Sequence, residues 1–102
     1  MNLLYETRKI MSNNNKTVYD IAACNIVNLD ACDELSTIIK TTAPSPEEFG
    51  TLLNIEYDNG YGSQEIDGTI LFNDNTWLSR GEYDGSEWWE YNKCPTIEEV
   101  IN

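Results

Sequence analysis

The sequence predicts an α+β fold, in which an antiparallel meander sheet of four to five strands carries one or two short helices. Three observations lead to this fold class. The chain of 102 residues has room for one modest hydrophobic core, so residues 1–102 are expected to form a single domain. Two helix-start signals stand in its first half. Three turn clusters separate strand-like segments in its second half.

The N-terminal residues are expected to contribute little to the fold. Residues 1–16 combine a weakly apolar start with a run of asparagines, which is typical of a flexible segment. Met11 could serve as an alternative translation start, which would make the residues before it dispensable. Residues 17–29 are rich in β-branched side chains and predict one strand or two short ones.

Two short helices are expected before the sheet. Asp30 is a favoured N-cap residue, and Asp33 follows at the spacing of a capping box. Residues 31–41 then place apolar side chains on one helical face, until a Thr-Thr-Ala-Pro sequence ends the pattern. Ser45, followed by proline and two glutamates, is a second start signal, and Gly50 is expected to limit that helix to about one turn.

From residue 51 onward, turn clusters alternate with strand-like segments. The turn clusters are Asp58-Asn59-Gly60, Asp74-Asn75 and Asp84-Gly85. The strand-like segments are residues 51–57, 65–72, 76–83 and 87–92. Such pairs of turn residues favour tight hairpins, so an antiparallel meander is expected over residues 51–92, with 17–29 as a candidate fifth strand.

Turn length sets which side chains share a face. A two-residue turn at 74–75 places Phe72 opposite Trp77 and Thr69 opposite Arg80, which gives one largely apolar face and one largely polar face. A bulged three-residue loop would exchange the two faces.

The turn at 84–85 has the Asp-Gly sequence favoured by two-residue hairpins. It places Gly81 opposite Trp88 and Arg80 opposite Trp89. Trp88 is therefore expected on the apolar face, covering the bare backbone of Gly81. Trp89 is expected on the other face, within reach of a cation–π contact with Arg80, or beneath the helices if they pack on that side.

The two registers together align Asp67, Glu82 and Glu87 in a row across three strands, with Glu65 extending the row. Carboxylates directly opposed in a sheet destabilise it. A sequence selected only for folding would more often place lysine or threonine there. The row is therefore the local feature that most favours a functional surface.

The charge is large and unevenly distributed. The chain has 18 acidic and 6 basic residues and a formal net charge of −12. Thirteen of the acidic residues, two of the basic ones and all three tryptophans lie in residues 47–102. Such a charge favours a basic protein surface as partner and disfavours direct contact with nucleic acid or a membrane. The simpler alternative is a soluble or salt-tolerant protein that tolerates its charge.

The residue types exclude several classes of chemistry. The chain has no histidine, which removes Ser-His, Cys-His and His-metal sites together. Its three cysteines show no CxxC spacing and, without histidine, cannot supply the usual zinc ligands, so no zinc site is expected. No bound cofactor is predicted either. With no apolar signal or membrane-spanning stretch, the cysteines are interpreted as reduced thiols of a cytoplasmic protein. No catalytic residue is predicted.

The functional prediction depends on the acidic and aromatic stretch RGEYDGSEWWEY, residues 80–91. The expected partner-binding residues are Asp67, Glu82, Glu87, Glu65, Asp84 and Glu90, with Trp89 and Tyr91 as aromatic anchors. The favoured function is occupation of a nuclease's basic groove, with carboxylates in place of phosphates. An immunity protein against a basic toxin is the next alternative. A carbohydrate- or calcium-binding module and a glycosidase carboxylate pair follow, although the chain lacks the spacing of a calcium loop.

In size, acidity, lack of catalytic residues and the aromatic-acidic segment 66–95, the chain resembles the small counter-defence proteins of bacteriophages. These are the anti-CRISPR and anti-restriction inhibitors, which share no common fold or motif. The resemblance implies a stoichiometric inhibitor of a host nuclease or guide-RNA complex that acts in the bacterial cytoplasm.

Overall fold

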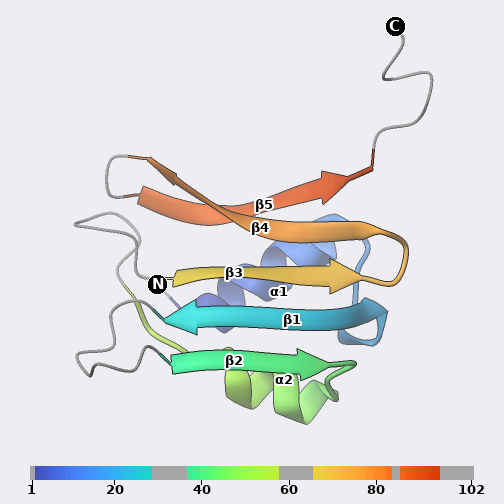
Figure 1. Cartoon of the computed structure of the whole chain (residues 1–102), viewed down its shortest axis with the longest axis horizontal. Coiled ribbons are helices and arrows are strands. Elements are labelled where there is room, and N and C mark those ends of the chain that lie inside the picture. The colour runs from blue at the N-terminus through green and yellow to red at the C-terminus, as the bar shows by residue number, and fades with distance from the viewer. Residues whose placement is uncertain (1, 29–36, 58–65, 84–85, 95–102) are drawn as a thin grey trace, which may run out of the picture.

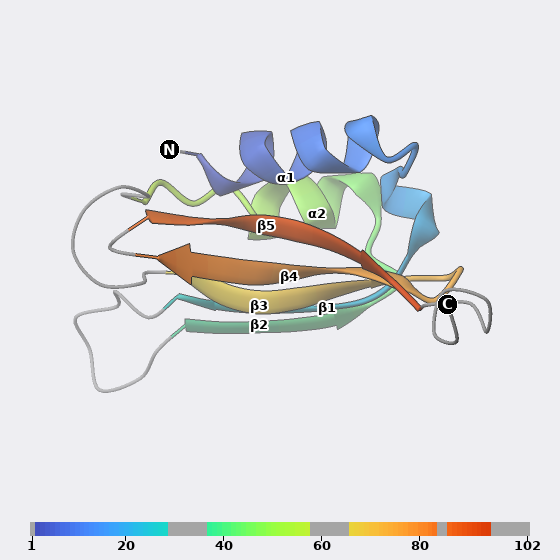
Figure 2. The ribbon, with the colours of Figure 1, turned by 90° about the horizontal axis from the view of Figure 1, so that it is seen from above.

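The structure, a computed structural model, describes residues 2–28, 37–57, 66–83 and 86–94. It contains an antiparallel five-stranded sheet in the order β2-β1-β3-β4-β5, with two helices against one face (Figures 1 and 2). The elements are α1 (Leu3–Asn13), a 3-10 turn (Val18–Asp20), β1 (Ile21–Asn28), β2 (Thr37–Thr42), α2 (Pro46–Leu52), β3 (Ile66–Phe72), β4 (Thr76–Tyr83) and β5 (Ser86–Lys93). The predicted α+β class is confirmed.

The N-terminal segment is a helix, which corrects the flexible segment predicted for residues 1–16. The side chain of Asn2 caps α1 by accepting a hydrogen bond from the backbone amide three residues on. Leu3, Thr7 and Met11 recur at helical spacing and are buried. Tertiary burial of this narrow stripe stabilises a helix whose asparagine-rich sequence favours it only weakly.

The predicted strand at residues 17–29 is confirmed by β1, which follows the short 3-10 turn. The helix predicted over residues 31–41 is wrong in its described part, because Thr37–Thr42 forms β2 and pairs with β1. This strand reads TIIKTT, and β-branched side chains favour an extended backbone. The proposed cap at Asp30 lies outside the described residues.

The second helix-start signal is confirmed. The Ser45 side chain accepts a hydrogen bond from the Glu48 amide at 3.1 Å, at the N-terminus of α2. The helix then continues through Gly50 for about two turns, which is longer than predicted. The strand predicted for 51–57 is wrong, because its first residues end α2 and Glu56 forms only an isolated bridge to the cap residue of α1.

The hairpin between β3 and β4 differs from the prediction by one residue. Leu71, rather than Phe72, pairs with Trp77, so the connection has three residues, 73–75. Asn75 has a φ of 66°, the left-handed conformation that asparagine adopts more readily than most residues. This extra residue exchanges the faces that the two-residue turn had predicted.

The hairpin between β4 and β5 has the predicted register, although the turn residues 84–85 lie outside the described residues. Its pairs include Tyr83–Ser86, Glu82–Glu87, Gly81–Trp88 and Arg80–Trp89. Trp89 therefore faces the helices, and Trp88 faces the opposite side of the sheet. The prediction that Trp88 belongs to the buried apolar face is wrong.

The hydrophobic core lies between the helices and one face of the sheet (Figure 2). Alternate residues of β3 are buried in it: Ile66, Ile70 and Phe72 are inaccessible, whereas Asp67, Thr69 and Leu71 are exposed. None of the described helices covers the other face. Neither α1 nor α2, the two α-helices of the described ranges, is long and apolar enough to cross a membrane.

Candidate functional site

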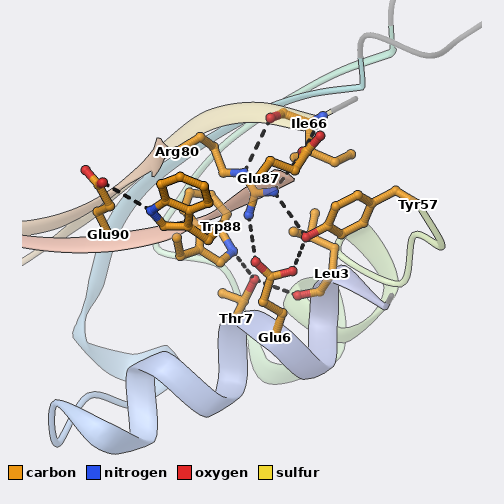
Figure 3. A network of polar contacts seen from close by, with 10 residues as sticks. Leu3, Glu6, Thr7, Tyr57, Ile66, Arg80, Glu87, Trp88 and Glu90 are labelled. Carbon is orange, nitrogen blue, oxygen red and sulfur yellow. Dashed lines mark hydrogen bonds and ion pairs between the residues drawn. The ribbon is translucent and has the colours of Figure 1, made fainter. Parts of the chain in front are cut away.

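A buried arginine stands between α1 and the sheet (Figure 3). The side chain of Arg80, on β4, has no solvent exposure. Its Nη1 lies 3.0 Å from Oε1 of Glu6 on α1, and its Nη2 lies 2.8 Å from Oε1 of Glu87 on β5. The side chain of Glu87 is equally buried. Charged groups of three separate elements therefore meet inside the protein.

Two aromatic rings enclose the same guanidinium. The Arg80 Cζ atom lies 4.8 Å from the centroid of Trp89 and 5.4 Å from that of Tyr57, both within cation–π range. The Tyr57 hydroxyl accepts a hydrogen bond from Arg80 at 3.1 Å and donates one to Glu6. Burial, together with the hydrogen bond to Glu6, raises the pKa of Tyr57 well above its usual value, so the hydroxyl remains neutral. The expected contact between Arg80 and Trp89 is present, beneath α1.

The charged pair also completes the sheet where β3 and β4 stop pairing. The register of these strands ends at Thr69 and Ser79. Closer to the start of β3, the Ile66 amide donates to Oε1 of Glu87 at 2.9 Å, and its carbonyl accepts from Nε of Arg80 at 3.4 Å. An unsatisfied buried polar group costs about 1–3 kcal/mol. The two side chains therefore bond the backbone of Ile66 beyond the point where the paired residues of β3 and β4 end.

These contacts form a structural junction between α1 and the sheet. Nε1 of Trp89 donates to Thr7 Oγ1 at 2.7 Å, and the Thr7 hydroxyl donates to the Leu3 carbonyl at 2.7 Å. Among the residues that the structure describes, no buried side-chain nitrogen or oxygen lacks a hydrogen-bond partner. Burial lowers the pKa of Arg80, but hydrogen bonds to Tyr57 and Glu87 raise it on balance, so the residue stays charged. The junction fixes α1 on the sheet.

The opposite face of the sheet carries large aromatic side chains that no described helix covers. We call the residues of β3, β4 and β5 on that face the open-face patch: Asp67, Thr69, Leu71, Trp77, Ser79, Gly81, Tyr83, Ser86, Trp88, Glu90 and Asn92. Tyr83 is 76% exposed and Trp88 is 38% exposed. Apolar residues scattered singly over a surface are normal, whereas a patch of exposed aromatic side chains indicates a site of interaction with another molecule.

The two charged members of this patch are both acidic, and one of them is held beside a tryptophan. The indole of Trp88 lies against Gly81, where an added Cβ atom would come within 2.5 Å of the indole Nε1. That nitrogen donates a hydrogen bond to Oε1 of Glu90 at 3.1 Å (Figure 3). The predicted covering of Gly81 by Trp88 is thus present, on the open face of the sheet.

The open face is also hollowed beside the patch. A depression of about 650 Å³ is lined by Ala23, Cys24, Asn25, Thr41, Thr42, Thr69 and Leu71, of which the last two belong to the patch. Burial raises the pKa of the Cys24 thiol to about 11, so at neutral pH this thiol is protonated and is a poor nucleophile.

The predicted row of carboxylates is wrong. Asp67 is exposed on the open face, whereas Glu87 lies in the buried junction and is only 2% exposed. Glu82 is exposed near the end of β4, opposite Glu87. The row fails because the three-residue loop moves β4 by one position relative to β3, which turns Asp67 away from the other two acids.

The remaining predicted binding residues are dispersed. Glu90 is exposed on the open face, Trp89 is buried beneath α1, and Tyr91 is half-buried and packs against the core. Glu65 and Asp84 lie outside the described residues. Sequence reasoning missed that Tyr83 and Trp88 are exposed and that half-buried Trp77 lies on the same open face. The asparagine at position 75 favours the left-handed loop conformation that places them there.

In the described ranges, no group of three or more histidine, cysteine or acidic side chains could hold a metal ion. Comparison of the chain with protein-family models, curated proteins and solved structures found no match.

Proposed function

We propose that this chain is a non-enzymatic inhibitor that binds a basic protein surface through its open-face patch. One observation carries the proposal. The patch places three aromatic side chains (Trp77, Tyr83 and Trp88) on the same face as two carboxylates (Asp67 and Glu90). No lysine or arginine belongs to the patch.

This composition fits a protein interface. Tryptophan and tyrosine are enriched among the residues that contribute most to binding, because they bury large areas with few rotatable bonds. Acidic groups around them select a partner of opposite charge and accelerate its encounter. A net charge of −12 adds a long-range attraction toward a basic surface.

The proposed partner is a nucleic-acid-binding protein, such as a nuclease or a CRISPR effector of a bacterial host, because such proteins carry basic grooves. The proposed place of action is the host cytoplasm. Since the carboxylate row does not form, the proposal depends on charge and aromatic contact, without requiring that acidic side chains reproduce the phosphate spacing of DNA. An immunity protein against a basic toxin would use the same surface chemistry.

Two double variants with the same charge change test this proposal. Asp67→Lys with Glu90→Lys reverses both charges of the open-face patch. Glu47→Lys with Glu48→Lys reverses two exposed charges on α2, in the helical layer. Both variants and the original chain are immobilised and exposed to bacterial lysate at low and high salt. The captured proteins are identified by mass spectrometry, and the binding of the purified partner is then measured.

The patch variant is expected to lose the partner, and the α2 variant is expected to retain it. Equal loss in both variants would show a diffuse electrostatic attraction without a defined site. Retention in both would show that another surface binds the partner. A captured nuclease or CRISPR component supports the favoured partner class, and a captured toxin supports the immunity alternative.

A further inference from the structure

We infer that Trp88 and Glu90 form a binding site, the arginine site, for an arginine side chain of the partner. This inference rests on the proposed function and specifies which chemical group the open-face patch recognises. The two residues are held together by the hydrogen bond from the indole Nε1 to Oε1 of Glu90. Among the described residues, Oε2 of Glu90 has no hydrogen-bond partner and can accept one from a ligand.

The sequence places a similar pair of residues on both faces of β5. Residues 87–90 read Glu-Trp-Trp-Glu, and side chains two apart along a strand share a face. Glu87 and Trp89 therefore face the helices, whereas Trp88 and Glu90 face the open side. Each face receives one carboxylate and one indole from the same four residues.

On the buried face, this pair holds an arginine of the chain itself. The guanidinium of Arg80 lies 4.8 Å from the Trp89 ring and 2.8 Å from Glu87, and Arg80 stands directly opposite Trp89 on β4. The protein thus contains its own example of an arginine bound by a tryptophan and a glutamate two residues apart.

On the open face, β4 supplies no cation to the corresponding pair. The residue opposite Trp88 is Gly81, and the residue opposite Glu90 is Ser79. Glycine and serine leave the indole 38% exposed and the carboxylate accessible. A cation at this position must come from another molecule.

The geometry favours arginine over lysine. A guanidinium is planar, so it can stack on an indole while its N–H groups donate to a neighbouring carboxylate. A lysine ammonium is a compact, strongly hydrated charge that gains less from the ring face. An arginine-bearing segment is therefore preferred to a lysine-bearing segment of equal charge.

Hexa-arginine and hexa-lysine peptides serve as probes in a calorimetric titration at low salt. The original chain is expected to bind hexa-arginine about twofold to fivefold more tightly than hexa-lysine. This ratio corresponds to the free energy of an exposed cation–π contact. Trp88→Leu should abolish this preference, and Trp88→Phe should keep part of it. Glu90→Gln should weaken the binding of both peptides.

Trp77→Leu is the matched control, because Trp77 lies on the same face and no carboxylate stands two residues from it on β4. This variant should keep the preference for arginine. A measurement on the unmodified chain avoids dependence on folding of the variants: hexa-arginine should shift the Nε1–H NMR signal of Trp88 more than those of Trp77 and Trp89.

Equal binding of the two peptides, or an unchanged preference in Trp88→Leu, would overturn the inference. So would a largest NMR shift at Trp77 or Trp89. The charge-reversal comparison with α2 reports separately on the proposed function. Loss of the partner in the patch variant, without any arginine preference, would support the proposed function and exclude the arginine site. An arginine preference that depends on Trp88, with partner capture unaffected by the patch variant, would support the arginine site and contradict the proposed function.

Discussion

Glu82 and Glu87 stand directly opposite each other on β4 and β5, yet their replacement by lysine is expected to have very different effects. Glu87→Lys removes the carboxylate 2.8 Å from Arg80 and places a second cation beside it. It also removes the acceptor 2.9 Å from the Ile66 amide. Breaking a buried ion pair in this way costs about 3–5 kcal/mol. That is a large part of the roughly 5–15 kcal/mol by which a small domain is stable.

Glu82→Lys makes the same charge change on an exposed side chain, and its effect should stay within about 0.5 kcal/mol. Glu87→Gln is an intermediate case, because glutamine keeps the volume and an acceptor oxygen but loses the charge, at a cost of about 1–3 kcal/mol. Urea unfolding followed by tryptophan fluorescence gives the free energies of unfolding. If Glu87→Lys and Glu82→Lys unfold at the same urea concentration, the side chain of Glu87 does not form the buried ion pair with Arg80.

Three further outcomes are expected. Asn75→Val should lower the free energy of unfolding by about 1–2 kcal/mol because a β-branched residue resists the left-handed conformation, whereas Asn75→Gly should not; equal stabilities would exclude the three-residue loop. A thiol reagent at pH 8 should modify exposed Cys94 before buried Cys24, as peptide mapping would show. Because burial raises the pKa of Cys24, the stability that its protonated thiol contributes is lost as the pH rises from about 9 toward 11. Hydrogen bonds from Lys16 and Thr76 lower the pKa of Asp74 to about 2, so an NMR titration should show a midpoint well below 3.8, and Lys16→Ala should raise that midpoint. The stability that this carboxylate contributes above pH 3.8 is lost as the pH falls toward 2.

The sequence predicts elements correctly where the determining groups are close together along the chain. The Ser45 cap and its helix involve residues three positions apart. The register between β4 and β5 is the one that the Asp-Gly sequence at residues 84–85 predicts. Such features depend on local backbone preferences, which the sequence contains in full.

The errors arise where distant contacts or one loop residue decide the outcome. Helix α1 depends on burying Leu3, Thr7 and Met11 against a sheet built from residues much later in the chain. The face of Trp88 depends on whether the loop before β4 has two or three residues, and Asn75 permits the longer one. Because strand side chains alternate, a one-residue shift sends every residue of β4 and β5 to the opposite face. The open-face patch therefore became visible only with the fold.

The position of Arg80 increases the effective acidity of the surface. Residues 47–102 contain two basic residues, Arg80 and Lys93, and the first is fully enclosed between α1 and the sheet. Lys93 is therefore the single basic residue of this half that is exposed, against thirteen acidic residues, of which Glu87 is also buried. An exposed aromatic face would ordinarily favour contact between copies of the same chain. Here a net charge of −12 on each copy opposes that contact and attracts a molecule of opposite charge. The same charge that costs the folded state stability through self-repulsion thus keeps the open-face patch accessible to a basic partner.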